Sequence, residues 1–303
     1  MNYRHSYHAG NFADVLKHAV LARVIAYMKQ KEAPFRVIDT HAGAGRYALT
    51  SPQAEKTGEW LGGIGRILGA GTGPLPPAVE RLLAPYLDAV RQANGGSDTP
   101  QRYPGSPAIA LSLLRPQDAL VANELHPEER RLLQQAVGRD RRAKVMGLDA
   151  WVALKALLPP KERRGVILID PPFEVRDELA RVQEGLAQSL RRFAGGVYVV
   201  WYPIKDPRPV ARFHAALRKL AVPKPLIVEL MVQPPTDAER LNGCGLLVIN
   251  APYTLKDELS SILPELSRRL AVVASAGSFR LESSNETGIP RVSAAKRRTR
   301  TST

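Results

Sequence analysis

The 303-residue sequence predicts an α/β fold built on a seven-stranded, mostly parallel sheet. The main observation is a series of apolar, β-branched runs separated by amphipathic stretches such as HPEERRLLQQAV and ELARVQEGLAQSLRRF. Strands that alternate with helices are typical of a parallel sheet covered by helices on both faces. A second observation is that four of the runs end in or beside an acidic residue, which places polar side chains at one edge of the sheet.

The first expected elements are a helix and a strand. Asn11 is a favourable N-cap, and apolar residues follow at helical spacing from Leu16 to Met28, which predicts a helix over 12–30. The apolar stretch FRVID then predicts the first strand, which enters the glycine-rich loop DTHAGAGRY.

The next segment, 48–118, shows no clear strand. Helices are predicted over 77–90 and over 106–115, the second with Ser106 as N-cap. The segment is therefore expected to be a helical insertion after the first strand.

Six further strands are predicted in the second half of the chain, over 119–125, 143–150, 165–170, 196–204, 225–232 and 245–253. The last two are joined without an obvious helix, which indicates an antiparallel hairpin at one edge. The core domain is thus expected over 1–47 and 119–275. Beyond it, Ser, Ala, Thr, Arg and Lys without periodicity predict a disordered basic tail over 276–303.

The charge of the chain is unusual for an ordinary globular protein. The 43 basic and 29 acidic residues give a net charge of +14, of which +4 falls in residues 277–303 and +10 in the folded part. A basic body favours a polyanionic partner such as nucleic acid, and the alternative is a solvated basic surface. The single cysteine, Cys244, excludes an internal disulfide and a cysteine-based zinc site, and its apolar neighbours predict burial.

Nothing in the sequence suggests a membrane segment. The N-terminus has no apolar targeting region, and no run of 18 apolar residues occurs. We therefore expect a cytoplasmic protein with no membrane partner.

The ends of the predicted strands carry the candidate ligand-binding groups, because open α/β sheets bind ligands beyond the carboxyl ends of their strands. Glu124 follows the second strand, where a carboxylate can accept from both hydroxyls of a ribose, or can be a solvated acid beside a helix start. Asp149 follows the third strand and can accept from an adenine amino group or cap the next helix. With the loop around Gly43, which lacks the full dinucleotide spacing, these acids favour an adenosine-containing ligand such as S-adenosylmethionine over NAD.

The fourth strand ends in Asp170-Pro171-Pro172-Phe173. A carboxylate and a proline carbonyl on a stiff turn provide two acceptors for the two N–H groups of an exocyclic amine. Hydrogen bonds to both acceptors localise the amine lone pair and make the nitrogen a better nucleophile. The ring of Phe173 offers a stacking surface to a flipped base, worth about 1–3 kcal/mol.

Five blocks carry a closer resemblance, from Tyr3 to about residue 270: YRHSYHAGNFADVLKH, DTHAGAGRY, YPGSP, NELHP and LIDPPFE. Together they are similar to those of the bacterial 23S ribosomal RNA adenine-N6 methyltransferases. The resemblance implies a Rossmann-like, class I S-adenosylmethionine-dependent methyltransferase with a helical insertion after the first strand. It also implies 23S rRNA as the partner. Apart from the resemblance, we expect a monomer that holds no metal.

The resemblance implies a role for individual residues. Lys17 and His18 would hold the methionine carboxylate, Asp170 would contact both the cofactor and the target amine and accept its proton, and Tyr3 would meet the RNA. The remaining cofactor-lining residues would be His41, Gly43, Ser106, Glu124, Asp149 and Ala150. Two positions depart from the usual pattern: Ala150 stands where the family often has Gly, and Phe173 where it often has Tyr. Alanine fits only if its φ is negative.

Three other interpretations fit parts of the sequence. A metal site could be assembled from His5 and His8, or from His41, His126 and Asp170, but no HExxH or CxxC spacing supports it. A non-catalytic RNA-binding protein on the same fold is disfavoured by the intact acidic and Asp-Pro-Pro-Phe motifs. A DNA adenine-N6 methyltransferase remains open, although no separate target-recognition domain is visible.

Overall fold

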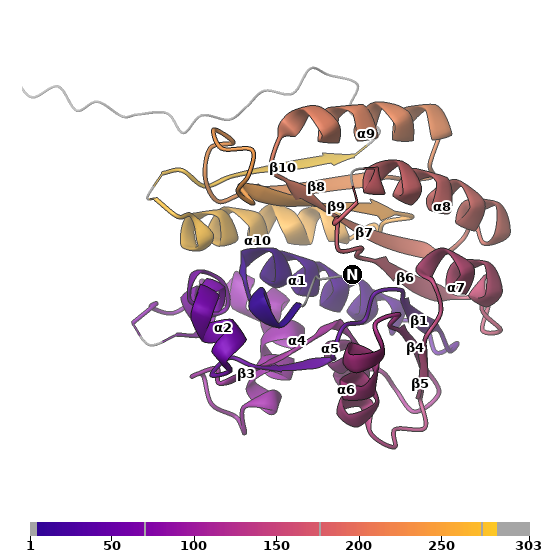
Figure 1. The fold of residues 1–303 in the computed structure, drawn as a ribbon, viewed down its shortest axis with the longest axis horizontal. Helices are drawn as coiled ribbons and strands as arrows, with labels where there is room; N and C mark the ends of the chain where they lie inside the picture. The colour runs from indigo at the N-terminus through magenta and orange to yellow at the C-terminus, as the bar shows by residue number, and fades with distance from the viewer. Residues whose placement is uncertain (1–4, 70, 176, 274, 284–303) are drawn as a thin grey trace, which may run out of the picture.

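The computed structural model describes residues 5–69, 71–175, 177–273 and 275–283. Its main sheet has eight strands in the order β10-β8-β9-β7-β6-β1-β4-β5 (Figure 1). The strands are β1 (Arg36–Asp39), β4 (Ala119–Asn123), β5 (Ala143–Met146), β6 (Gly165–Ile169), β7 (Val197–Ile204), β8 (Leu226–Met231), β9 (Gly243–Ile249) and β10 (Ser278–Ser283). Five neighbouring strands of the sheet are parallel, in the order β7, β6, β1, β4 and β5. Strand β9 runs antiparallel to both β7 and β8. The predicted fold class and the antiparallel β8–β9 hairpin are confirmed.

The predicted number of seven strands is wrong by one. The additional strand, β10, pairs antiparallel with β8 over its whole length and covers the edge that the hairpin would otherwise expose. It lies within 276–303, so the prediction of disorder is wrong for Ser278–Ser283. The segment SFRLES has only two large apolar residues, and it is held by pairing with β8 rather than by a local hydrophobic pattern.

Helices cover both faces of this sheet. The helices of the described residues are α1 (Phe12–Met28), α2 (Pro52–Thr57), α3 (Gly65–Leu68), α4 (Pro77–Ala93), α5 (Ser106–Leu113), α6 (Pro127–Val137), α7 (Ala150–Leu157), α8 (Glu178–Arg192), α9 (Pro207–Leu220) and α10 (Leu255–Leu270), with short 3₁₀ turns η1 (His5–Tyr7) and η2 (Glu59–Gly62). Alternate strand residues point to opposite faces, so Leu168 packs into a cluster with α1, α4, α5 and α10, whereas Ile167 packs with α7, α8 and α9. None of the helices in the described part of the chain is long and apolar enough to cross a membrane.

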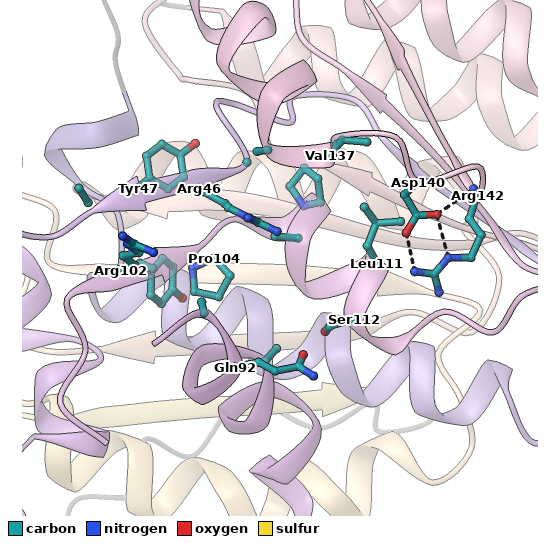
Figure 2. Close-up of a pocket in the computed structure, with 18 residues that line it drawn as sticks. Arg46, Tyr47, Gln92, Arg102, Pro104, Leu111, Ser112, Val137, Asp140 and Arg142 are labelled. Atoms are coloured by element: carbon teal, nitrogen blue, oxygen red, sulfur yellow. Dashed lines mark hydrogen bonds and ion pairs between the residues drawn. The ribbon is translucent and has the colours of Figure 1, made fainter. Parts of the chain in front are cut away.

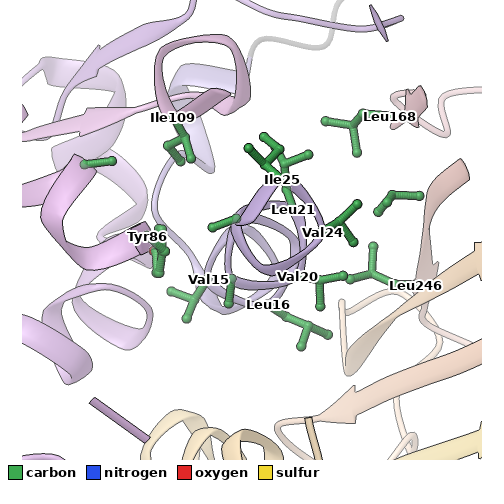
Figure 3. Packing of buried hydrophobic residues seen from close by; sticks show 14 of the residues in the cluster. Val15, Leu16, Val20, Leu21, Val24, Ile25, Tyr86, Ile109, Leu168 and Leu246 are labelled. Carbon is green, nitrogen blue, oxygen red and sulfur yellow. The ribbon is translucent and has the colours of Figure 1, made fainter. Parts of the chain in front are cut away.

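Helix α1 is buried on all sides and forms the centre of the larger cluster (Figure 3). Val20 and Val24 lie toward Leu246 and the sheet, and Val15 lies toward Tyr86 of α4. As predicted, Asn11 caps the helix by accepting from the backbone N–H groups of Ala13 and Asp14. Packing of this kind fixes the N-terminal end of α1 against the carboxyl ends of β1 and β6.

The segment after β1 differs from the predicted helical insertion in two details. It contains β3 (Arg102–Pro104), which pairs with β2 (Arg46–Ala48) in a separate two-stranded sheet. Helix α5 begins one residue earlier than expected, with Gly105 rather than Ser106 at the N-cap. Strands of three residues carry too little periodicity to be recognised in a sequence. The division into core, insertion and tail stays a prediction.

Candidate active site

A cavity of about 900 Å³ lies at the carboxyl ends of β1, β4 and β6, beside the start of α1. It brings together every predicted site residue that the structure describes: Lys17, His18, His41, Gly43, Ser106, Glu124, Asp149, Ala150, Asp170, Pro171 and Phe173. Tyr3 lies outside the described residues. Residues far apart in the sequence thus share one site because parallel strands end at the same edge.

The main electrostatic feature of the cavity is a lysine between two carboxylates. Lys17 Nζ lies 2.5 Å from Asp170 Oδ2 and 2.8 Å from Asp14 Oδ1. Burial alone would lower the pKa of Lys17, but the two carboxylates raise it well above its ordinary value. Lys17 is therefore a cation that orients Asp170. The role expected for it, holding the methionine carboxylate, remains a prediction.

Asp14 is the residue of this group that the sequence analysis missed. Its Oδ2 accepts from Gly10 N at 2.9 Å and lies 2.9 Å from His5 Nε2. Burial works in the opposite direction, but the charges of His5 and Lys17 hold the pKa of Asp14 well below its ordinary value. The i,i+3 spacing of Asp14 and Lys17 on a predicted helix was a signal that could have found the pair.

His18 also lines the cavity, and one of its ring nitrogens has no hydrogen-bond partner among the described residues. Its Nδ1 lies 2.7 Å from the hydroxyl of Tyr103, which in turn lies 3.0 Å from that of Tyr86. Burial lowers the pKa of His18 to about 3, so the ring is neutral near pH 7. Its buried Nε2 has no hydrogen-bond partner among the described residues. Such an atom is a candidate ligand contact, because buried polar groups are usually paired.

Glu124 shapes the glycine-rich loop as well as the cavity. Its Oε2 accepts from Gly43 N and its Oε1 from His126 N, both at 2.8 Å. Gly43 has a φ of 59°, and a Cβ there would meet the Tyr47 hydroxyl at 2.2 Å, so only glycine fits. The carboxylate is therefore anchored by two backbone groups and is held in a defined position at the wall of the cavity.

A second buried acid, Asp39, stands behind the loop. Ser106 Oγ donates to its Oδ2 at 2.6 Å, so Ser106 contacts the strand end as well as the cavity. Burial raises the pKa of Asp39 to about 6, although the hydrogen bond from Ser106 acts in the opposite direction. This contact joins the YPGSP and DTHAGAGRY blocks.

Asp149 caps a helix, as one of the two interpretations predicted, and its contact with an adenine amino group stays a prediction. Its Oδ1 accepts from the backbone N–H groups of Trp151 and Val152 and caps α7, and its side chain also lines the cavity. Ala150, the first residue of α7, is not among the residues with positive φ, so alanine is tolerated there as expected.

The Asp-Pro-Pro-Phe turn leaves β6 with an unusual backbone. Phe173 has a φ of 51°, a left-handed conformation that costs a non-glycine residue of order 1 kcal/mol or more and is enriched at functional sites. Its ring stands edge-on to Trp201 of β7, with centroids 5.6 Å apart. The turn therefore fixes an aromatic ring and the Asp170 carboxylate on the same wall of the cavity.

Contacts between the N-terminal segment and the insertion were also not predicted. Glu59 accepts from Asn11 Nδ2 at 2.9 Å, and one of its carboxylate oxygens lies 2.9 Å from His8 Nδ1. All three residues line the cavity. The hydrogen bond with Glu59 raises the pKa of His8. Among the described residues, no group of three or more His, Cys, Asp or Glu side chains is arranged to hold a metal ion.

Comparison with known proteins identifies the relatives of this chain. A family model described as "Ribosomal RNA large subunit methyltransferase D, RlmJ" matches residues 32–283. The ribosomal RNA large subunit methyltransferase J of Escherichia coli K12 is 43% identical over 270 residues, 89% of this chain and 94% of its own length. The protein of the same name from Haemophilus influenzae is 40% identical over 282 residues, 93% of this chain and 98% of its own. A crystal structure from Legionella pneumophila, 34% identical, covers 91% of this chain and 98% of its own with a TM-score of 0.82.

Proposed function

The chain belongs to the ribosomal RNA large subunit methyltransferase J family, and on that premise we propose that it methylates the exocyclic N6 of an adenine in 23S rRNA. As a member of that family it is a methyltransferase of large-subunit ribosomal RNA. The observation that carries the finer assignment is the Asp170–Lys17 pair at the start of the Asp-Pro-Pro-Phe turn.

The residues of the cavity fit S-adenosylmethionine, which supplies an electrophilic methyl group when bound. The anchored Glu124 carboxylate is suited to the ribose hydroxyls, and Asp149 to the adenine amino group. His18 lines the cavity, and its Nε2, which has no hydrogen-bond partner among the residues that the structure describes, offers one further hydrogen bond. Gly43 keeps the backbone close to the ligand.

Asp170 is the group proposed to act on the target amine. Lys17 binds its Oδ2, and no hydrogen bond to Oδ1 occurs among the described residues, so this oxygen is available to accept from the amine. The Pro171 carbonyl would accept the second N–H, and Phe173 would stack on the base. As the C–N bond forms and the methyl–sulfur bond breaks, S-adenosylhomocysteine would leave as a neutral thioether, and one N6 proton would pass to Asp170 and from there to water, which leaves a neutral methylated amine.

The experiment that tests this function offers tritiated S-adenosylmethionine with three substrates in parallel: deproteinised 23S rRNA, assembled large subunits and DNA. Digestion to nucleosides and mass spectrometry then identify the product. N6-methyladenosine from the ribosomal samples is expected. Label in DNA alone, or in another nucleoside, would overturn the assignment.

A further inference from the structure

A second cavity, of about 690 Å³, lies behind the glycine-rich loop (Figure 2). Its walls come from the β2–β3 ribbon and from α4, α5 and α6, and they include Pro104, Leu111 and Val137. Gln92 and Ser112 add polar groups at its wall. None of the roles assigned to the active site uses this cavity.

The arginines of the ribbon are the charged groups that this cavity leaves unpaired. Tyr47 and Tyr103 are opposite one another and buried on one face, so their neighbours Arg46 and Arg102 take the other face. Both arginines are exposed, and neither guanidinium has a hydrogen bond or ion pair within the described part of the chain.

Among the described residues that line the cavity, the single acid is already neutralised. Asp140 pairs with Arg142 through contacts of 2.6 and 3.0 Å, on the other side of the cavity from Arg102 (Figure 2). The cavity therefore has a net charge of +2 from Arg46 and Arg102, above a mainly apolar wall. Unpaired guanidinium groups bind phosphates, and an apolar wall accepts the face of a base.

The two cavities share one wall of the protein. Gly43 and Ser106 line the active-site cavity. The second cavity is lined by Gly45, two residues after Gly43, and by Pro107, which follows Ser106. Tyr47 lines both cavities. A polynucleotide that places one nucleotide in the active site can therefore reach the second cavity by passing around the loop. A small anion would not need the apolar volume.

We propose that the second cavity binds an unpaired nucleotide of the same ribosomal RNA substrate. Its phosphates contact Arg46 and Arg102, and its base lies against Pro104 and Leu111. The inference rests on the proposed function for the identity of the RNA. It adds a substrate contact outside the reacting centre, which contributes to RNA affinity and not to the methyl-transfer step.

The test compares the wild-type chain with Arg46→Ala/Arg102→Ala in filter binding to 23S rRNA over a salt series and in steady-state methylation. The double variant is expected to raise KM for RNA about tenfold and to leave kcat at saturating RNA unchanged. Loss of two phosphate contacts should reduce the slope of log affinity against log salt by about 1.4. The affinity for S-adenosylmethionine alone, measured by calorimetry, should not change.

The matched control is Arg191→Ala/Arg212→Ala, which removes the same charge from exposed positions on α8 and α9. Figure 1 shows these helices on the far side of the molecule from the β2–β3 ribbon. An equal loss of RNA affinity in the control, or an unchanged salt slope in the ribbon variant, would overturn the proposal.

A second variant tests the cavity itself without changing its charge. Ala93, half-buried at the end of α4, lines the cavity, so the ring in Ala93→Phe should occupy part of it and raise KM for RNA with no change in the salt slope. An unchanged KM in this variant would overturn the placement of a base in the cavity. Because RNA affinity is measured without turnover, a chain that bound RNA through the cavity but methylated only DNA would contradict the proposed function alone.

Discussion

At the scale of single residues, the site depends on how Lys17 is shared. A buried cation between Asp14 and Asp170 keeps both carboxylates in place, and removal of Lys17 would leave two buried carboxylates without their cation. Lys17 contacts Oδ2 of Asp170, which leaves Oδ1 for the proposed contact with the target amine. Asp170 should be replaceable without unfolding the chain, because Lys17 would still be paired with the carboxylate of Asp14.

The first prediction concerns Asp170. Asp170→Ala should lower kcat by at least about a hundredfold, because the amine loses its acceptor, while RNA affinity persists. Asp170→Asn should lose less if hydrogen bonding matters more than charge. Single-turnover methylation and filter binding measure the two quantities, with the exposed Asp88→Asn as a control that keeps full turnover. Wild-type turnover in Asp170→Ala would end its catalytic assignment.

The second prediction concerns Glu124. Glu124→Ala removes the proposed ribose acceptor and releases Gly43 N, so the affinity for S-adenosylmethionine should fall by about 2–3 kcal/mol. Glu124→Gln keeps an acceptor for one backbone N–H, so its affinity for S-adenosylmethionine should fall by less. Calorimetry checks both variants, and an unchanged Kd in Glu124→Ala would contradict the ribose assignment.

At the scale of elements, a buried network joins β7, β8, β10 and α9. Arg280 NH1 lies 3.4 Å from His214 Nδ1 and 3.4 Å from Glu229 Oε2, while the Tyr202 hydroxyl lies 3.0 Å from both His214 Nε2 and Glu229 Oε1. An arginine can only donate, so Nδ1 of His214 accepts and its Nε2–H donates to Tyr202, which donates to Glu229. Every donor in this network has an acceptor only while His214 is neutral.

The third prediction is therefore a pH dependence of stability. Burial, with the charges of Arg280 and Arg218, lowers the pKa of His214 to about 4, below its value near 6.5 in an unfolded chain. Between pH 4 and pH 6.5 the unfolded state binds more protons than the folded state. The contribution of neutral His214 to the free energy of unfolding is therefore complete above pH 6.5 and is lost as the pH falls toward 4. Its size is about 2–3 kcal/mol.

Urea unfolding of the wild type and of His214→Gln between pH 4 and 8 measures this contribution. The free-energy difference between the two proteins should be largest at pH 8 and should shrink by about 2 kcal/mol toward pH 4. Parallel curves would show that the pKa of His214 is the same in the folded and unfolded states.

The fourth prediction concerns β10. A chain ending at Gly277 loses Arg280, leaves Glu229 buried without its cation and uncovers the edge of β8, which should cost about 2–3 kcal/mol. Its Tm should fall by about 5 °C or more. A chain ending at Ser283 retains the strand and is the control. Equal Tm values by calorimetry would mean that β10 adds nothing to stability.

At the scale of the whole molecule, the positive charge is spread over the body and the C-terminal segment. Residues 284–303 hold five basic residues and one acid, a net charge of +4 that is separate from β10. Non-specific attraction to RNA scales with the phosphates that such charges neutralise. The proposed contact at Arg46 and Arg102 would add a localised term on the folded body.

The fifth prediction follows from that separation. Truncation after Ser283 should reduce the salt slope of RNA binding by up to about 3, if four charges each engage a phosphate. Turnover at saturating RNA should stay the same, because every candidate site residue lies before position 174. A loss of turnover would mean that residues beyond Ser283 act on the site.

Local patterns were sufficient for much of the fold. Runs such as GVILID are strands because they are apolar and β-branched, and the Asn11 cap and the glycine of the loop act through neighbouring backbone groups. Ligands of open α/β sheets bind beyond the carboxyl ends of the strands, and this rule predicted from the sequence that Glu124, Asp149 and Asp170 would lie in one site. The structure places all three in one cavity. These features depend on residues close together in the sequence.

The sequence by itself therefore determined the fold class, the strand ends and three acidic residues of the site, Glu124, Asp149 and Asp170. Only the tertiary structure decided that Lys17 pairs with Asp170, 153 positions away, that Ser106 holds Asp39, and that β10 completes the sheet. The physical reason is that a strand or cap is stabilised by nearby backbone and side-chain groups, whereas a buried ion pair or an edge strand is stabilised by a partner supplied by the folded chain.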